Sequence, residues 1–425
     1  MPTPSLILVP ARFKTGKLYT PVATTSGGLV LGASGDFNVT RATTATRVNA
    51  SGNIEVVASG IPRLDYPIGG GCPALLVEPQ AQNTCLQSET FQSWSFTNAS
   101  GSSGNVAASP SNTQTAGLFI PNSGTTGRGE VACGTLSNAT TYSFSCFIKT
   151  PTNSLTSVWL YISDGGGGTG GNRWGVEINL SNFTLTDYTA GNGSVTSKAV
   201  ENYGNGWYRV RVTGQVTSGM SGSSVAVVRK LTAGADTNGI NGVLIWGAQF
   251  ETGSIATSYI PTTTAPITRN ADVITLSGAV SGCIGQTEGT LYAEVDVRTF
   301  ANGNRIVCLS DGTSDNRIIL QEGANSTLQA IVTNATSGVV DISTASGRTA
   351  GIYKIAIGYK QNDFAVYVNG SQTGTDNTGG VPACNQIFIG KIETTATTNQ
   401  FNDRIRAAAL YTTRLTDLEL AALTT

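Results

Sequence analysis

Three aromatic side chains flank a glycine-rich loop and offer the clearest binding chemistry in the sequence. Trp159 and Tyr161 precede the loop at 164–171, and Trp174 follows it. Aromatic rings stack on the apolar faces of pyranose rings, planar polar groups hydrogen-bond sugar hydroxyls, and glycine lets the backbone approach a ligand closely. The alternative interpretation is that both tryptophans are ordinary sheet residues around a flexible loop. The candidate glycan site comprises Trp159, Tyr161, Asp164, Asn172, Arg173 and Trp174.

The chain of 425 residues contains no histidine, which removes several kinds of catalytic chemistry. Without imidazole there is no Ser-His-Asp or Cys-His arrangement and no histidine-ligated metal. Two carboxylates can hydrolyse a glycosidic bond without histidine, but no such pair stands out here. The short-period repeats of a β-helix, which depolymerases of bacterial glycans usually carry, are also absent from the sequence. We therefore expect a protein that is not an enzyme.

The charge balance argues against nucleic-acid and membrane partners. There are 25 Lys and Arg residues against 26 Asp and Glu, a formal net charge of −1, and charged residues make up 12% of the chain. Ordinary globular proteins have about 25%. A chain without net positive charge has no field to attract phosphates, and no apolar run approaches the ~18 residues that span a bilayer. The basic residues of 1–17 follow the apolar stretch, the wrong order for a secretory signal, so we expect synthesis in the cytoplasm.

Seven cysteines are spread along the chain without a CxxC pair or a metal-like cluster. We interpret them as buried, reduced side chains that pack as small apolar residues. The alternative is disulfide formation in an oxidising exterior, for which Cys133 and Cys146 are the first pair to test. The cysteines are Cys72, Cys85, Cys133, Cys146, Cys283, Cys308 and Cys384.

Apolar and polar residues alternate with period two in many segments, which predicts strands with one buried and one solvated face. The segments 142–149, 208–212 and 291–298 are examples, and turn-rich stretches separate them. This spacing is typical of antiparallel sandwiches, so the predicted fold class is all-β. Trp207 and Trp246 lie in strongly apolar segments and are expected in the core.

One short helix is predicted at the C-terminal end. Thr416 and Glu419 have capping-box spacing, and Leu415 and Leu420 occupy the two positions of a hydrophobic staple.

Three segments are expected along the chain. Residues 1–85 are rich in Thr, Gly and Pro and have too few long strands for an independent sandwich, so we interpret them as an attachment and assembly segment. Residues 86–265 and 266–425 each have regular strands and are separated by a Thr/Pro-rich connector at 261–266. The tight turns predicted at 361–363 and 369–370 make consecutive hairpins, which build sandwiches.

Several sequence blocks resemble those of tailed-phage virion proteins. RATTATRVNASG at 41–52, IPRLDY at 61–66 and LLVEPQAQN at 75–83 resemble the N-terminal regions of tail-fibre, spike and head-fibre proteins. WGAQFETGSIATSYIPTTTAPITRNAD at 246–272 is similar to the end of their carbohydrate-binding-module-like jelly roll. EGTLYAEVDV, YKIAIGYKQNDFAVYVNGS and RIRAAALYTTRLTDLELAAL, beginning at 288, 353 and 404, are similar to concanavalin A-like (laminin G-type) lectin domains.

The resemblance implies a jelly roll followed by a lectin-like sandwich. It also implies calcium as the ion that such domains often carry, with oxygen ligands and a structural role. The candidate ligands are Glu78, Gln249 and Glu251 for the jelly roll, and Asp311, Asp315 and Asp403 for the lectin-like domain. The alternative interpretation is that these carboxylates are solvated.

Function is expected from the resemblance as well. It implies a structural protein on the virion surface, made in the host cytoplasm, whose residues 1–85 attach to other capsid or tail proteins. We expect a homotrimer that displays weak glycan-binding domains in many copies, whose avidity then exceeds that of one site. The alternatives are a capsid decoration or head-fibre protein that mainly stabilises the shell, and a receptor-binding tail fibre.

Overall fold

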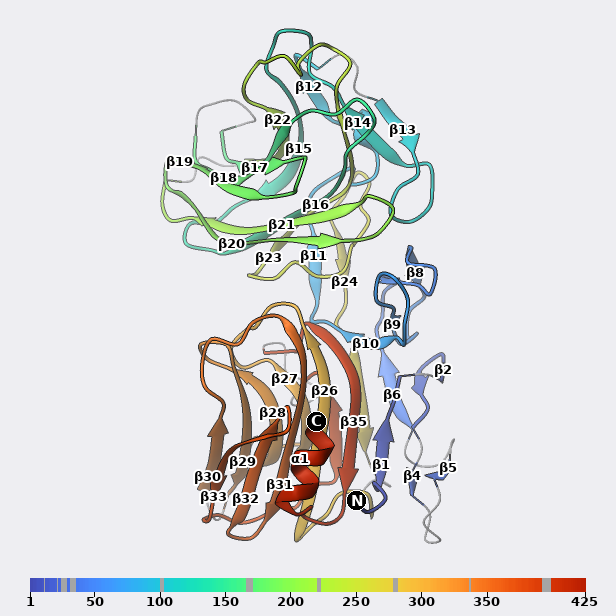
Figure 1. The fold of residues 1–425 in the computed structure, drawn as a ribbon, viewed down its shortest axis with the longest axis vertical. Helices are drawn as coiled ribbons and strands as arrows, with labels where there is room; N and C mark the ends of the chain where they lie inside the picture. The colour runs from blue at the N-terminus through green and yellow to red at the C-terminus, as the bar shows by residue number, and fades with distance from the viewer. Residues whose placement is uncertain are drawn as a thin grey trace.

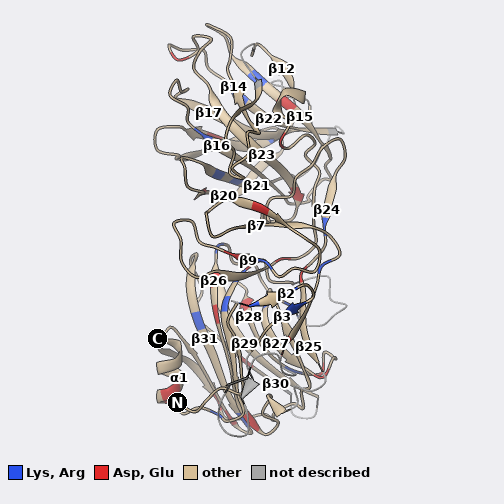
Figure 2. Cartoon of the chain, turned by 90° about the vertical axis from the view of Figure 1, so that its right-hand side faces the viewer, with Lys and Arg blue, Asp and Glu red and all other residues tan. Residues whose placement is uncertain are grey.

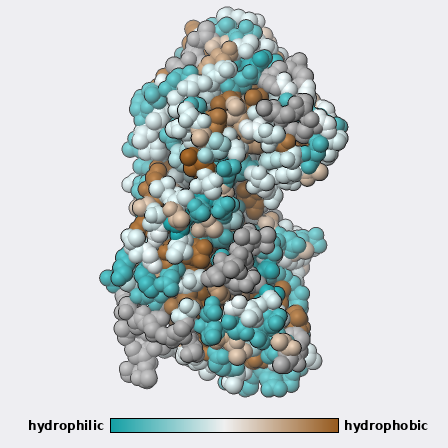
Figure 3. Space-filling model, turned by 180° about the vertical axis from the view of Figure 1, so that it is seen from behind, coloured by the Kyte–Doolittle hydropathy of each residue, from teal (hydrophilic) through white to brown (hydrophobic). Residues whose placement is uncertain are grey.

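The computed structural model describes two β-rich lobes stacked along the long axis (Figure 1). Seen from behind, a notch separates the lobes at the waist of the molecule (Figure 3). The predicted all-β class is confirmed: strands dominate both lobes, and no helix in the described ranges is long and apolar enough to cross a membrane. The structure describes residues 1–10, 12–20, 22–23, 29–30, 36–99, 103–165, 171–219, 223–277, 282–335, 338–391 and 399–425.

The upper lobe is a jelly roll of two facing antiparallel sheets. Their inner faces form one core that includes Phe144, Val210 and Val228, as period-two alternation predicts. A short 3-10 turn at Phe91–Ser93 precedes the first strand of the lobe. The first sheet runs β12 (Ser95–Thr97), β15 (Gly127–Thr135), β22 (Ser223–Lys230), β17 (Ser157–Ser163), β18 (Arg173–Asn179), β19 (Leu185–Ala190). The second runs β13 (Ser103–Ala107), β14 (Ala116–Phe119), β23 (Val243–Thr252), β16 (Tyr142–Lys149), β21 (Tyr208–Val216), β20 (Gly193–Asn202).

The outer face of the second sheet is buried as well. Phe147, Trp246 and Tyr259 pack there in edge-on and tilted ring contacts. Trp207 and Ile54 join the same cluster, so a residue of the N-terminal segment contacts the jelly roll. The predicted burial of both tryptophans is confirmed, because Trp207 and Trp246 are almost fully enclosed.

The lower lobe is a sandwich built from two distant parts of the sequence. One sheet runs β33 (Ser371–Asp376), β32 (Asp363–Val368), β31 (Gly351–Lys360), β26 (Glu288–Val297), β35 (Asp403–Tyr411), β1 (Leu6–Leu8), β4 (Val22–Ala23), β5 (Leu29–Val30), with β10 (Ala74–Val77) also on β35 and β9 (Leu64–Asp65) on β10. The other runs β2 (Phe13–Lys14), β3 (Lys17–Leu18), β6 (Phe37–Thr40), β25 (Val273–Ser277), β34 (Gln386–Ile389), β27 (Arg305–Ser310), β28 (Asn316–Gly323), β29 (Thr327–Asn334), β30 (Gly338–Ser343). Residues 1–85, expected as a separate attachment segment, therefore share hydrogen-bonded sheets with 266–425.

The jelly roll is inserted into this sandwich through a two-stranded ribbon. The chain leaves the sandwich along β11 (Ala81–Asn83) and returns along β24 (Ile267–Arg269), and the two strands pair from Ala81↔Arg269 to Asn83↔Ile267. A hairpin of β7 (Ala45–Val48) and β8 (Ile54–Val57) lies beside this ribbon at the waist (Figure 1). The jelly roll and the sandwich therefore meet at one junction, and both β11 and β24 pass through it.

The predicted C-terminal helix is confirmed as α1 (Asp417–Thr424). The Thr416 side chain accepts a hydrogen bond from the Glu419 backbone N–H, and the Glu419 side chain accepts one from the Thr416 backbone N–H. Leu415 and Leu420, the predicted staple, are buried against the outer face of the sheet. That face carries the small residues Ala356, Ala365 and Ala409, which let the helix lie close to the strands.

All seven cysteines are free thiols in the structure, so Cys133 and Cys146 form no disulfide there. Six of them are buried, as predicted, and burial raises the pKa of the Cys133 and Cys146 thiols to about 12. Cys72, in the connection between β9 and β10, is exposed.

Candidate functional site

The outer face of the first jelly-roll sheet gathers aromatic rings and guanidinium groups. Trp159 and Tyr161 alternate with the core residues of β17 and so point to the outer face, where they pack with Tyr188 of β19 and Val227 of β22. Trp159 is 9% exposed and Tyr161 is fully buried, whereas Tyr188 is partly exposed. Tyr188 is therefore the most accessible aromatic ring of this face.

A glycine in the middle of the sheet explains how the rings meet. Tyr161 pairs with Gly175 across β17 and β18, and Gly175 pairs with Tyr188 across β18 and β19. A Cβ atom at Gly175 would lie 2.4 Å from Cβ of Tyr161, so only glycine leaves room there. The two tyrosine rings meet edge to face with centroids 5.1 Å apart.

Two arginines hold these tyrosines from the sides. Arg173 Nη1 donates a hydrogen bond of 2.9 Å to the Tyr188 hydroxyl, and its guanidinium carbon lies 5.6 Å from the centre of that ring. Arg229 Nη1 donates to the Tyr161 hydroxyl at 3.3 Å. The face therefore combines aromatic rings with planar hydrogen-bond donors, and we call these five residues, Trp159, Tyr161, Arg173, Tyr188 and Arg229, the aromatic face.

Trp174 lies on the opposite side of the same sheet. It is fully buried in the jelly-roll core, with its ring centroid 6.2 Å from that of Phe250. Its neighbour Arg173 belongs to the aromatic face because successive side chains of a strand point to opposite faces. The structure thus separates Trp174 from Trp159 and Tyr161, and its ring offers no exposed surface for stacking.

Asp164 and Asn172 close the base of the glycine-rich loop. Asp164 accepts hydrogen bonds from the Asn172 backbone N–H at 2.7 Å and from its side-chain amide at 2.8 Å. Asn172 Oδ1 accepts from the backbone N–H of Asn192 at 2.7 Å. Both side chains are buried and fix the ends of the loop, whose middle, 166–170, lies outside the described residues.

Tyr188 and Arg229 were not among the predicted site residues. Arg229 comes from β22, which lies beside β17 only through sheet pairing, whereas Tyr188 comes from β19, which follows β18 in the sequence. The available signal for Tyr188 was its ring, as it is the aromatic residue of the segment LTDYTA at 185–190.

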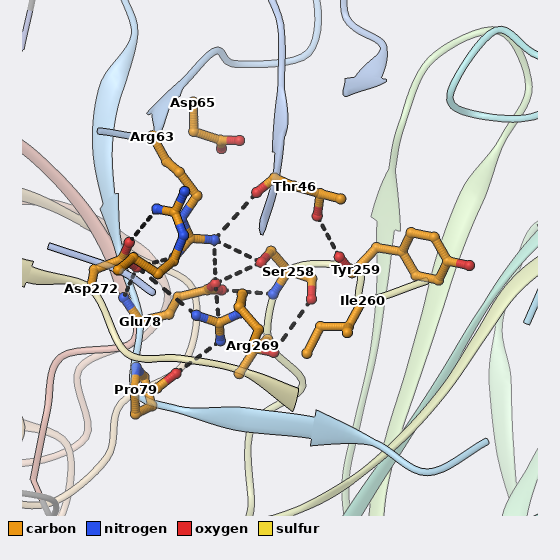
Figure 4. A network of polar contacts seen from close by, with 12 residues as sticks. Thr46, Arg63, Asp65, Glu78, Pro79, Ser258, Tyr259, Ile260, Arg269 and Asp272 are labelled. Carbon is orange, nitrogen blue, oxygen red and sulfur yellow. Dashed lines mark hydrogen bonds and ion pairs between the residues drawn. The ribbon is translucent and has the colours of Figure 1, made fainter. Parts of the chain in front are cut away.

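The first candidate calcium ligand, Glu78, lies in a buried ionic network at the junction of the lobes (Figure 4). Arg63 Nη1 donates to Glu78 at 2.6 Å, Arg269 lies 3.4 Å from it, and Ser258 donates to it from both backbone and hydroxyl. Burial alone would raise the pKa of Glu78, but the charges of Arg63 and Arg269 outweigh it and hold the pKa well below its usual value. Asp272 completes the network through Arg63 and Arg41.

Gln249 and Glu251 lie next to this network. Gln249 Nε2 donates to Glu251 at 2.7 Å, and Gln249 Oε1 accepts from the Ile260 backbone N–H at 2.6 Å. Thr257 donates to Glu251 from its backbone and its hydroxyl. The structure therefore brings Glu78, Gln249 and Glu251 together around 257–258, with their oxygens already hydrogen-bonded by protein donors.

The three lectin-domain candidates are divided between two places. Asp311 accepts hydrogen bonds from Thr313 and Asn316 in the loop after β27, and Asp315 lies in the same loop. Asp403 begins β35, where it is buried and paired with Arg298 at 2.7 Å. Within the described ranges, no group of three or more Cys, Asp or Glu side chains could hold a metal ion. Calcium at the buried Glu78, Glu251 or Asp403 would have to displace their protein partners.

Comparison with known proteins gave structural matches only. No family model matches the chain, and no curated protein matches it. The carbohydrate-binding module CBM40 of the Ruminococcus gnavus IT-sialidase matches with 15% identity and a TM-score of 0.30, over 33% of this chain and 84% of that one. Domain 4 of the arabinanase AbnA from Geobacillus stearothermophilus, solved with arabinotriose, matches with 13% identity and a TM-score of 0.31, over 41% and 84%. A K499G mutant of the sialidase NanB from Streptococcus pneumoniae matches with 11% identity and a TM-score of 0.31, over 36% and 26%.

Proposed function

We propose that this chain is a non-catalytic glycan-binding protein displayed on the exterior of a tailed-phage particle. The observation that carries glycan binding is the aromatic face, where Tyr188 presents a ring beside the guanidinium group of Arg173. A sugar would stack on the ring and hydrogen-bond the surrounding polar groups, which is the combination that saccharides require. The phage setting is supported by the sequence blocks at 41–52, 61–66 and 75–83.

Binding at one such face would be weak, because two of the three rings are largely covered. A particle that carries many copies compensates, since each further contact is made at high effective concentration. We therefore propose a homotrimer, attached through residues 1–85 to capsid or tail proteins, as the displayed form. Shell decoration and receptor binding at the tail tip stay the alternatives for its place on the particle.

Glycan binding is tested by removing the accessible ring. The full chain is screened on an array of bacterial surface glycans, and affinity for each hit is measured by calorimetry. We expect Tyr188→Ala to weaken binding about fivefold, because one aromatic contact is worth on the order of 1 kcal/mol. The matched control is Tyr208→Ala, which removes a partly exposed tyrosine of the same lobe that stacks on Phe183. No hits, or equal loss in both variants, would contradict the proposal.

Two further measurements address display and catalysis. Immunogold labelling of intact particles locates the protein at head or tail, and failure to label any particle would refute the virion assignment. Light scattering of the full chain gives the mass, which a homotrimer makes three times that of one chain. Reducing ends released from host polysaccharide would overturn the non-catalytic assignment.

A further inference from the structure

A cleft of about 310 Å³ lies at the junction of the two lobes, away from the aromatic face. Figure 2 shows the elements that frame it, with β20 of the jelly roll above β9 and β26 of the sandwich. Its walls come from three parts of the chain: the N-terminal segment, the end of β20, and the strands β26 and β35. Its volume is at the small end of the range for ligand pockets, so it suits one or two sugar units rather than a long chain.

The cleft has a polar lining that is electrically balanced. Three guanidinium groups and three carboxylates line it, so the lining has no net charge and would not favour a charged ligand. The most accessible of these groups are Arg406 and Asp296, whose side chains are 34% and 33% exposed. The charged lining residues are Arg298, Arg404, Arg406, Asp65, Glu201 and Asp296.

Ion pairs fix these groups in place before any ligand arrives. Arg404 pairs with Asp65 at 2.6 Å and lies 3.8 Å from Asp296, and Arg406 pairs with Glu294 at 2.6 Å. On the jelly-roll side, Glu201 pairs with Arg211 at 3.0 Å. Paired guanidinium and carboxylate groups present donors and acceptors in alternation, which matches hydroxyl groups that both donate and accept.

The rest of the cleft lining is largely apolar. It is formed by Val48, Pro67, Ile68 and Ala74 of the N-terminal segment. Tyr203 adds an aromatic ring from the jelly roll, held edge-on against Phe147 with centroids 4.9 Å apart. The apolar residues lie among the charged ones, since the Val48 backbone N–H donates to Asp65 and Ala74 pairs with Asp65 across the strands. A lining that mixes apolar side chains with charge-balanced polar groups suits a neutral saccharide, which has apolar ring faces and a rim of hydroxyls.

We propose that this junction cleft is a second binding site, for a neutral mono- or disaccharide. It shares no residue with the aromatic face, so binding at the cleft can be tested independently of glycan binding at the aromatic face. Because both lobes contribute to its lining, a saccharide bound there contacts both sandwiches at once.

Cys72 provides a local reporter for the test. It lines the cleft and is exposed, whereas the other six cysteines are buried, so a thiol reagent added to the native chain reads this position selectively. The rate of Cys72 alkylation by iodoacetamide is measured with D-glucose, D-galactose, D-mannose, L-rhamnose, N-acetyl-D-glucosamine and their disaccharides, and with D-glucuronate as an anionic probe. We expect at least one neutral sugar to slow the reaction about tenfold at ten times its Kd, when about one cleft in ten is empty. Protection by none of them would overturn the proposal.

Variants separate the cleft from the rest of the molecule. Arg406→Ala should abolish the protection of Cys72, whereas Lys360→Ala, which removes an exposed charged side chain from the same sandwich, should leave it intact. Tyr188→Ala should also leave it intact while it weakens binding to the aromatic face. Equal effects of Arg406→Ala and Lys360→Ala would refute the site, and melting temperatures confirm that each variant is folded.

The charge balance makes a second prediction about the ligand class. Asp296→Asn keeps the shape of the side chain but leaves the lining with one net positive charge, so D-glucuronate should begin to protect Cys72. The control is Asp341→Asn on the exposed edge strand β30, which should not change the selectivity. Protection by D-glucuronate in the unmodified chain would show that the cleft takes anions and would overturn the neutral assignment.

Discussion

Glu322 is a carboxyl group buried in the lower sandwich, and it forms no ion pair with any residue in the described ranges. Burial raises its pKa to about 8, and the negative charge of Asp403 adds to the effect, while a hydrogen bond from the Ala301 backbone N–H opposes it. The folded chain therefore holds a proton that the unfolded chain loses near pH 4.5. Between these two values the folded state binds more protons, so stability falls as the pH rises from about 5 to 8.

Glu322→Gln removes the titrating group but keeps a side chain of the same shape. We expect the loss of stability between pH 5 and 8 to shrink by on the order of 4 kcal/mol, the free energy that such a pKa shift represents. Urea unfolding at pH 5, 6, 7 and 8 measures it, with the partly exposed Glu288→Gln as the control. The assignment is wrong if both variants keep the pH dependence of the unmodified chain.

The sequence predicted three residues of the aromatic face, Trp159, Tyr161 and Arg173, but it did not show which side of the sheet each side chain would occupy. Trp174 and Arg173 are adjacent in sequence, but Trp174 points into the core and Arg173 points to the outer face of the sheet, where it is 6% exposed. Which face of β18 is buried depends on the opposing sheet, where Phe250 of β23 packs near Trp174, and β23 lies far from β18 in the sequence. Tyr188 was not predicted, because it meets Tyr161 across β18 only where Gly175 leaves room between the two rings.

The first jelly-roll sheet requires a glycine at position 175. A Cβ atom there would lie 2.2 Å from the Leu160 carbonyl oxygen. Because β18 is hydrogen-bonded to strands on both edges, it cannot move away to relieve this clash. We expect Gly175→Ala to destabilise the chain by roughly 2 kcal/mol or more, as overpacking of a well-packed sheet does. Gly351→Ala is the control, because its nearest atom would be 3.9 Å away at the start of β31. Equal unfolding midpoints in urea would contradict this.

Elements fixed by local chemistry were predictable, and those fixed by distant pairing were not. Helix α1 carries its own cap and staple, and the turn between β31 and β32 has Asn362 at a φ of 56°, a left-handed conformation that asparagine tolerates. The N-terminal strands have no such signals. Pieces of two to four residues, such as β9 and β6, become strands only because β10 and β25 lie beside them.

At the scale of the whole molecule, the N-terminal segment completes the lower sandwich and closes the junction. Leu6, Phe37 and Leu75 belong to the same core as Leu291 and Ile355. A chain of 267–425 alone would leave the edge of β35 that pairs with β1 and β10 without hydrogen-bond partners, and it would uncover part of the shared core. The jelly roll has its own core, and the chain enters and leaves it along β11 and β24. Ile54 of the N-terminal segment adds a contact to the outer face of its second sheet. The lower sandwich therefore needs residues 1–83 to complete its core, whereas the core of the jelly roll does not include them.

This difference predicts how fragments behave. Residues 84–266 alone should unfold in one cooperative transition, whereas 267–425 alone should not, because two of the three strands that pair with β35 are missing. Joining residues 1–83 directly to 267–425 through an Asn-Gly turn should restore cooperative unfolding, because Asn83 and Ile267 already face each other across the ribbon and a two-residue turn connects such a pair. Thermal melts followed by circular dichroism compare the three chains. A cooperative melt of 267–425 alone, equal to that of the joined chain, would show that the N-terminal strands merely decorate a sandwich that folds without them.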